Sequence, residues 1–369
     1  MKNIMIIIDG MTDEAYKELA HKTPYEAAYP LNMKYMKANG CYGFFDNNIA
    51  GYPVDSLTCI LNLLGVAKEN IPKGRAYLEA VAQGIKVNDD DLVMRCNFVS
   101  LDEEGRLKAS HGGNLSAEEY KKKAAMIKHS EDYEFYHMSY YKNLLVLKAP
   151  IINSFKEYPP HENIGIDFKQ IIPENPVLKG FVEESIKTLN DKKIKYALIP
   201  WGLSKKQMIP GFKELHNIKG ASVCATEIVR GISLAMGMDT PTLKYATADT
   251  DTNLEEKAAK ALALLKDNDF VLIHLNGADE AAHRRNVKEK ADFISKIDSI
   301  LIKDLLNNTK DTNILITSDH STICRTGKHQ GDLQPFIIYN DSLKVSQDLG
   351  IIKGQKAVEL LKKFNITKM

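Results

Sequence analysis

The stretch Asn3-Ile4-Met5-Ile6-Ile7-Ile8-Asp9-Gly10 decides the fold of this chain. It is a short run rich in isoleucine, with a charged residue before it and an Asp-Gly turn signal after it. Because β-branched residues favour strands and no polar positions alternate with them, the run is typical of a strand buried on both faces of a parallel sheet. The apolar segment Ile4–Ile8 is far too short to cross a membrane.

Similar runs and several helical patterns follow along the chain. Further buried strands are predicted at Tyr196–Pro200, Phe270–Leu275 and Asn313–Thr317, and helices at Ser222–Met236, Leu254–Leu265 and Lys288–Leu306. Strands that alternate with helices predict an α/β sheet domain with helices on both faces.

Between residues 87 and 179 the pattern changes to short alternating segments. Asp91–Ser100 and Tyr141–Lys148 are typical of antiparallel strands, and Ser116 to Glu119 forms a capping box that begins a helix over Ala117–His129. We therefore expect a smaller α+β domain, 87–179, inserted into a discontinuous sheet domain made of 1–86 and 180–369.

Composition narrows the class of protein. The chain has 369 residues, of which 44% are hydrophobic, enough for one large or two ordinary cores. With 49 basic against 48 acidic residues, no nucleic-acid or membrane partner is predicted. The five cysteines never form a CxxC pair and no signal-peptide pattern is present, which is typical of reduced thiols in a cytoplasmic protein. Nothing in the composition specifies an oligomeric state.

Acidic and histidine residues follow the predicted strands. Asp279 and His283 stand at i and i+4, so one helix face would carry both side chains. Each such pair alone is more often structural, but open α/β sheets bind ligands just beyond the carboxyl ends of their strands. Together these residues supply the carboxylates and imidazoles of a two-metal site: Asp9, Asp279, His283, Asp319, His320 and His329.

Ser56 precedes an apolar segment, Leu57–Leu64, that is predicted to be a buried helix ending at Gly65. The position predicts that Ser56 is the N-cap of this helix. A hydroxyl at the positive end of a helix is also suited to be a nucleophile, since a metal there would lower its pKa. The two roles are compatible.

In chain order, these residues resemble the metal pattern of the alkaline phosphatase superfamily. More closely, the chain resembles the archaeal-type cofactor-independent (2,3-bisphosphoglycerate-independent) phosphoglycerate mutases, over nearly its whole length. The resemblance is carried by Thr23–Ala28, Gly74–Ala80, Arg95–Phe98, Pro159–His161, Trp201-Gly202, Gly237–Asp239, His274–His283 and Pro335-Phe336. It implies an alkaline-phosphatase-like sheet domain and an inserted substrate or lid domain that closes over it.

The resemblance also implies roles for individual residues. Ser56 would be the catalytic nucleophile that forms a phosphoserine intermediate, while 3-phosphoglycerate and 2-phosphoglycerate are interconverted in glycolysis. One metal would be held by Asp9, Ser56, Asp319 and His320, and the other by Asp279, His283 and His329. Two divalent ions are expected, Mn²⁺ in preference to Zn²⁺ or Mg²⁺, with no bisphosphoglycerate. The substrate, a small phosphorylated carboxylic acid, would be bound by Arg75, Arg95, His161, Arg284 and Arg285.

The chain departs from the family pattern where substrate is held. An Arg-x-Gly-Arg stretch is replaced by Ser110–Asn114, a His-Arg pair by Lys142-Asn143, and an acidic turn after His283 by Arg284-Arg285-Asn286. Because arginine binds phosphate and carboxylate through two hydrogen bonds at once, these losses predict altered selectivity. The alternative is therefore a relative with a shifted substrate, either a phosphatase or a homoserine-kinase-like phosphotransferase that acts on another small phosphorylated acid. A hypothesis of a different class is a metal-free binding or scaffold protein. No GxxxxGK[ST] loop is present, so no nucleotide is expected.

Overall fold

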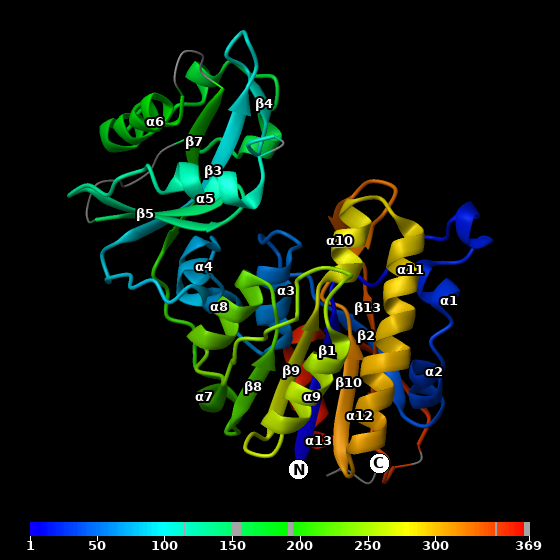
Figure 1. Ribbon diagram of the computed structural model, residues 1–369. Helices are drawn as coiled ribbons and strands as arrows, with labels where there is room; N and C mark the ends of the chain where they lie inside the picture. The colour runs from blue at the N-terminus through cyan, green and yellow to red at the C-terminus, as the bar shows by residue number, and fades with distance from the viewer. Residues whose placement is uncertain (114, 149–155, 191–194, 344, 365–369) are drawn as a thin grey trace. The chain divides into compact units, whose positions relative to one another are not determined.

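The computed structural model describes residues 1–113, 115–148, 156–190, 195–343 and 345–364. The chain divides into two units, a larger one made of Met1–Ile71 and Met208–Met369 and a smaller one made of Pro72–Gln207 (Figure 1). Asn114, the last residue of the altered Ser110–Asn114 stretch, lies outside the described residues. No helix within the described ranges is long and apolar enough to span a membrane.

A seven-stranded sheet forms the centre of the larger unit. Its strands are, in spatial order, β14 (Gln347–Lys353), β2 (Cys41–Asp46), β13 (Gln334–Tyr339), β10 (Thr312–Thr317), β1 (Lys2–Ile8), β9 (Phe270–Leu275) and β8 (Gly220–Val223). The predicted strand after Met1 is thus a central one, with parallel neighbours on both sides. The prediction of an α/β sheet domain is confirmed.

Helices cover both faces of this sheet (Figure 1). The helices of this unit are α1 (Pro24–Ala28), α2 (Leu31–Ala38), α3 (Ser56–Leu63), α7 (Phe212–His216), α8 (Glu227–Ala235), α9 (Leu254–Leu264), α10 (Gly277–His283), α11 (Val287–Lys296), the π-helical η5 (Ile297–Ile302), α12 (Lys303–Asn308) and α13 (Ala357–Lys363). The unit also contains a small hairpin, β11 (Ser321–Ile323) and β12 (Lys328–Gln330), and the short 3₁₀ turns η1 (Lys17–Leu19), η2 (Lys68–Asn70) and η6 (Gly354–Lys356).

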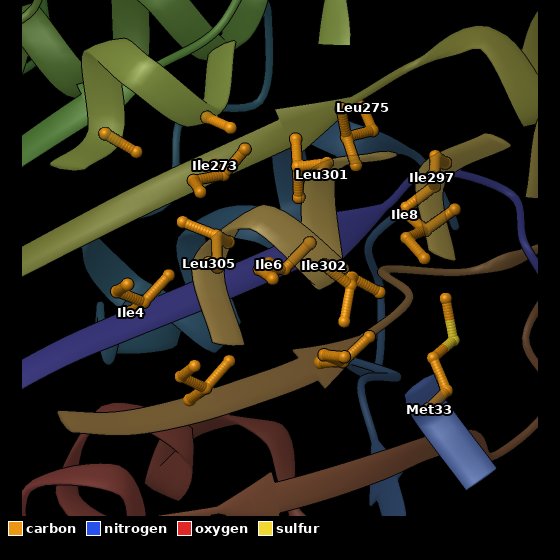
Figure 2. Packing of buried hydrophobic residues seen from close by; sticks show 14 of the residues in the cluster. Ile4, Ile6, Ile8, Met33, Ile273, Leu275, Ile297, Leu301, Ile302 and Leu305 are labelled. Carbon is orange, nitrogen blue, oxygen red and sulfur yellow. The ribbon is translucent and has the colours of Figure 1, made fainter. Parts of the chain in front are cut away.

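The side chains of β1 alternate between two buried faces. Ile4, Ile6 and Ile8 pack with Ile297 and Leu301 of η5 in one hydrophobic cluster (Figure 2). The intervening Met5 and Ile7 point to the opposite face and are equally buried. A strand covered on both faces needs apolar residues at every position, which explains why this run shows no polar alternation.

The smaller unit is built on an antiparallel sheet of β4 (Leu107–Ala109), β3 (Leu92–Leu101), β6 (Lys142–Leu147) and β5 (Tyr133–Ser139), with β7 (Tyr196–Lys205) paired to the other side of β3. Its helices are α4 (Ala76–Ala82), α5 (Ala117–Ala124) and α6 (Pro176–Leu189), with the 3₁₀ turns η3 (Pro160–Glu162) and η4 (Phe168–Gln170). A smaller α+β unit within the α/β chain was predicted, and it is present.

Its extent differs from the predicted 87–179. The strand at Tyr196–Pro200 was assigned to the parallel sheet, but β7 runs antiparallel to β3 and shares the hydrophobic core of the smaller unit. Helix α4 also packs on β3. An apolar run predicts burial without specifying which sheet supplies the neighbours, so the sequence pattern left both boundaries too narrow.

Two predicted helices are shorter than expected. Ser222 belongs to strand β8, and the helix begins only at Glu227. The capping box at Ser116 and Glu119 is present, but its helix ends at Ala124 and does not reach His129. The long helical pattern at Lys288–Leu306 is confirmed as the continuous series α11, η5 and α12.

Candidate active site

Parallel pairing brings three aspartates to one edge of the central sheet. Ile7 of β1 pairs with Thr317 of β10, and Ile8 pairs with Leu275 of β9. The residues that follow these strands therefore emerge side by side. They include Asp9 after β1, Asp279 in the helix after β9, and Asp319 after β10.

The first group of candidate ligands contains Asp9, Asp319 and His320, whose ligand atoms all lie within 4.8 Å of one another. Nε2 of His320 is 3.5 Å from Oδ1 of Asp9 and 3.4 Å from Oδ2 of Asp319. All three side chains are buried, and these two carboxylate oxygens have no hydrogen-bond partner among the described residues. Because unpartnered buried carboxylate oxygens are costly, the group is suited to bind a cation.

The second group is centred on Asp279. In helix α10, Nε2 of His283 lies 3.2 Å from Oδ2 of Asp279, which confirms the predicted shared helix face. His329 comes from β12 and places Nε2 at 3.4 Å from Oδ1 of Asp279 and 3.2 Å from Nε2 of His283. The ligand atoms of Asp279, His329 and His320 also lie within 4.8 Å of one another, so His320 is within reach of both groups.

Burial and charge shift the pKa values of this cluster in opposite directions. Burial raises the pKa of Asp9 well above its usual range, and the neighbouring carboxylates of Asp319 and Asp279 raise it further. Burial also acts to raise the pKa of Asp279, but hydrogen bonds from His283 and His329 hold it well below its usual range. The same bond to Asp279 raises the pKa of His283 to about 9. Burial and the neighbouring carboxylates thus disfavour the ionised form of Asp9, and a cation beside it would act in the opposite direction.

Ser56 lies beside the first group but is not the helix cap. The N-cap of α3 is Asp55, whose carboxylate accepts a hydrogen bond from the backbone N–H of Thr58, and Ser56 is the first helical residue. Serine and aspartate both cap helices, and in this chain the cap is the aspartate, Asp55. The Ser56 hydroxyl is therefore available to donate to Oδ2 of Asp9 at 3.2 Å, and it lies 3.3 Å from Nε2 of His320.

His274 is a member of this site that the sequence patterns did not single out as a ligand. It is fully buried in β9, and its Nε2 lies 3.1 Å from Oδ2 of Asp9 without hydrogen-bond geometry. Burial lowers the pKa of His274 to about 4, so the ring is neutral. The signal that could have identified it is a histidine inside an otherwise apolar strand that ends at the predicted site.

Three of the predicted substrate residues come together in the smaller unit. The guanidinium of Arg95 stacks over the ring of Trp201 at 4.5 Å, and the ring of His161 lies 5.5 Å from the same indole. Nε of Arg75 and Nε of Arg95 lie 2.7 and 3.3 Å from the two carboxylate oxygens of Glu79, which is buried. Two arginines around one buried acid form a cationic cluster, defined here as Arg75, Arg95 and His161.

Arg284 and Arg285 follow helix α10 in the larger unit. The guanidinium of Arg284 forms two hydrogen bonds to Asp249, at 2.7 and 2.8 Å, and another to Glu289 at 2.6 Å. Arg285 has φ of +60° and directs Nη2 toward the carbonyl of Thr326 at 3.5 Å. Arg284 thus ties the end of α10 to α11 and to the segment before α9.

The residues of the larger unit fit a pair of divalent ions. Imidazole and carboxylate together suit zinc, manganese and iron, and a buried cation would satisfy the unpartnered oxygens of Asp9 and Asp319. A hydroxyl nucleophile beside these carboxylates, together with two metal ions that stabilise the transferred phosphoryl group, is what a phosphoryl-transfer site requires.

Comparison with known proteins agrees with this chemistry. The sequence profile of the metalloenzyme superfamily matches residues 1–363. The 2,3-bisphosphoglycerate-independent phosphoglycerate mutase of Pyrococcus furiosus is 33% identical over 91% of this chain and 88% of its own length. A solved structure of a Pyrococcus horikoshii protein aligns with a TM-score of 0.81 and 28% identity, over 100% of this chain and 98% of that one. The cofactor-independent phosphoglycerate mutase of Thermoplasma acidophilum shares the fold, with a TM-score of 0.64 and 23% identity over 98% and 99% of the two chains.

Proposed function

This chain belongs to the metalloenzyme superfamily and to the family of 2,3-bisphosphoglycerate-independent phosphoglycerate mutases, and from that premise we propose that it interconverts 3-phosphoglycerate and 2-phosphoglycerate through a phosphoserine at Ser56. The observation that carries the proposal is the cluster of three buried carboxylates and three imidazoles beside the Ser56 hydroxyl. Buried like charges in such numbers are unfavourable unless cations accompany them.

Two divalent ions would be held by the two groups described above, and we favour Mn²⁺ over Zn²⁺ and Mg²⁺. Asp9, Asp319 and His320 would hold one ion together with Ser56, and Asp279, His283 and His329 the other. When bound, the pair lowers the pKa of a hydroxyl in contact with it and offsets the negative charge of the phosphoryl group in the transition state.

The chain's own groups support the transfer in two steps. The Ser56 hydroxyl donates to Asp9, which orients Oγ for attack on phosphorus. As the Oγ–P bond forms, Ser56 loses its hydroxyl proton, the bond from phosphorus to the 3-oxygen of the substrate breaks, and that oxygen takes up a proton. The 2-hydroxyl of the resulting glycerate then loses its proton and attacks the phosphoserine. The Oγ–P bond breaks and Oγ takes up a proton, which regenerates Ser56.

For the substrate we propose contacts from the smaller unit. Arg75, Arg95 and His161 lie together there, and stacking on Trp201 holds the guanidinium of Arg95 in place. Arginine suits the carboxylate and phosphate of a phosphoglycerate. Arg75 and Arg95 share one carboxylate, that of Glu79, whereas Arg284 alone binds two, those of Asp249 and Glu289, so we give Arg284 a lesser part. Arg285 directs Nη2 toward the carbonyl of Thr326, and we give it a lesser part as well.

A second candidate function is phosphoryl transfer on another small phosphorylated acid, or simple phosphatase activity. The observation that favours it is Asn143, which replaces a family arginine. Its side chain is buried, bonds His137 and donates to the carbonyls of Cys96 and Tyr141, so it offers no cationic group to a ligand.

One experiment separates these candidates. Purified protein is assayed with 3-phosphoglycerate in an enolase-coupled assay, beside homoserine phosphate and a generic phosphate ester, with Mn²⁺ present and after chelation. We expect isomerisation that is lost on chelation and restored by Mn²⁺. Hydrolysis of the generic ester without isomerisation would favour the phosphatase, and activity that survives metal removal would refute the two-metal proposal.

A further inference from the structure

One hydroxyl connects the two groups of candidate ligands. Oγ1 of Thr322 donates a hydrogen bond to Oδ1 of Asp279 at 2.6 Å and lies 3.3 Å from Nδ1 of His320. Thr322 is fully buried in β11, two residues after His320. Neither the sequence patterns nor the family roles considered above include this residue.

The direction of these bonds follows from proton counting. A hydroxyl carries one proton and two acceptor lone pairs. The shorter bond is to a carboxylate, which only accepts when ionised, so the proton of Thr322 points at Asp279. The contact with His320 therefore needs a proton on Nδ1 of the imidazole, which Thr322 accepts.

A proton on Nδ1 fixes the tautomer of neutral His320. Its Nε2 is then a bare lone pair, and Nε2 is the atom that faces the oxygens of Asp9 and Asp319. Metal-binding histidines generally have the second ring nitrogen held in this way by a hydrogen-bond partner. The same Thr322 hydroxyl occupies one lone pair of Asp279, in the other ligand group.

The surroundings of Thr322 hold it rigidly. The buried ammonium of Lys290 donates to the carbonyls of Thr322 and Thr12, at 2.8 and 3.2 Å, and to Asp13 at 2.9 Å. Gly10 closes the space on another side, because a Cβ there would lie 2.6 Å from Oγ1 of Thr322 and 2.9 Å from Oδ1 of Asp279. The loop after β1 is thus packed directly against this hydrogen bond.

We propose that Thr322 is a positioning residue that orients one ligand in each metal group, by accepting from Nδ1 of His320 and donating to Asp279. The inference rests on the proposed two-metal function. A merely structural threonine would satisfy its hydroxyl equally well on a backbone carbonyl, as Thr317 does with the carbonyl of Pro335 at 3.0 Å.

The test compares three variants in the full chain. Thr322→Val has nearly the same shape and lacks the hydroxyl, Thr322→Ser keeps the hydroxyl, and Thr317→Val is a matched control that removes another buried hydroxyl bond. Metal-free protein is titrated with Mn²⁺ by calorimetry, and the melting temperature of each metal-free variant is measured. Loss of a hydrogen-bond partner to metal ligands lowers affinity by about 10- to 100-fold.

We expect Thr322→Val to weaken Mn²⁺ binding by that factor, while Thr322→Ser and Thr317→Val stay close to the wild type. Wild-type affinity in Thr322→Val would overturn the role of Thr322 alone, whereas a wild-type protein that binds no Mn²⁺ would overturn the proposed function as well. The tautomer gives a readout that needs no variant: ¹⁵N NMR of histidine-labelled, metal-free wild type should show His320 protonated on Nδ1. Protonation on Nε2 would overturn the inference even if Thr322→Val failed to fold.

Discussion

Replacing Ser56 with alanine tests the centre of the proposed mechanism, and the structure separates its effect on stability from its effect on activity. Ser56 is the first residue of α3, and the cap of that helix is the carboxylate of Asp55. Ser56→Ala therefore removes a single oxygen and leaves the cap intact. The lost interaction is the hydrogen bond to Asp9 at 3.2 Å.

The expected magnitudes differ by several kcal/mol. A hydrogen bond to a charged group contributes about 1.5–3 kcal/mol, and alanine recovers about 0.5 kcal/mol through its helix propensity, so the net loss of stability should be about 1–2.5 kcal/mol. Removing a nucleophile that acts with its partners can lower kcat by about 10⁶-fold, which is about 8 kcal/mol in the activation barrier. A folded protein without turnover is the expected result.

The assay follows both quantities. Urea unfolding gives stability, the enolase-coupled reaction gives turnover, and incubation with ³²P-labelled 3-phosphoglycerate should label the wild type and not Ser56→Ala. Asp55→Ala is the matched control, because it removes the cap at a cost of about 1 kcal/mol and keeps the nucleophile. Isomerisation or labelling that persists in Ser56→Ala would refute the role of Ser56. If Asp55→Ala were as inactive as Ser56→Ala, the loss of activity would be due to disruption of α3 and not to the missing hydroxyl.

Three further predictions concern charge and metal. Arg284→Ala should lower stability by about 0.5–1 kcal/mol for each half-exposed ion pair lost, to Asp249 and Glu289, with little change in KM; a raised KM at unchanged melting temperature would instead make Arg284 a substrate contact. Burial lowers the pKa of Lys257 to about 8, so the unfolded chain binds this proton up to higher pH than the native protein does. The free energy of unfolding of the wild type, relative to that of Lys257→Met, should therefore rise between about pH 8 and 10. Urea unfolding of both proteins at these two pH values measures the difference, and the same difference at both would contradict the prediction. Adding Mn²⁺ to the metal-free protein at about 100 times its dissociation constant should stabilise it by about 2.7 kcal/mol per site, which thermal melts would detect, and an unmoved melting temperature would argue against the metal site.

Local patterns in the sequence were sufficient to predict the features that depend only on residues nearby in the chain. The pairing of Asp279 with His283 depends only on helical periodicity, and it was predicted and is present. The capping box at Ser116 and Glu119 also depends on four consecutive residues alone. The buried run of β1 was recognisable because a strand covered on both faces leaves no position for a polar side chain.

Choices between equivalent partners were decided only by tertiary structure. The run that became β7 is apolar whichever sheet it joins, and its pairing with β3 is a long-range choice. Asp55 and Ser56 are both good caps, and in the structure Asp55 caps α3 while the Ser56 hydroxyl donates to Asp9, a residue far away in the sequence. Each residue has the same chemistry in either arrangement, so its own sequence neighbourhood cannot distinguish them.

Part of the candidate site was likewise predictable from local sequence, and part was decided only by tertiary structure. That aspartates and histidines follow the strands was apparent from the sequence, since each lies next to its own apolar run. That His274 faces Asp9, and that the Thr322 hydroxyl joins Asp279 to His320, depends on the register between parallel strands and on a hairpin far along the chain. The distances from Asp9 to His274 and from Asp279 to Thr322 are set by packing between segments far apart in the chain, and no periodicity within one segment encodes them.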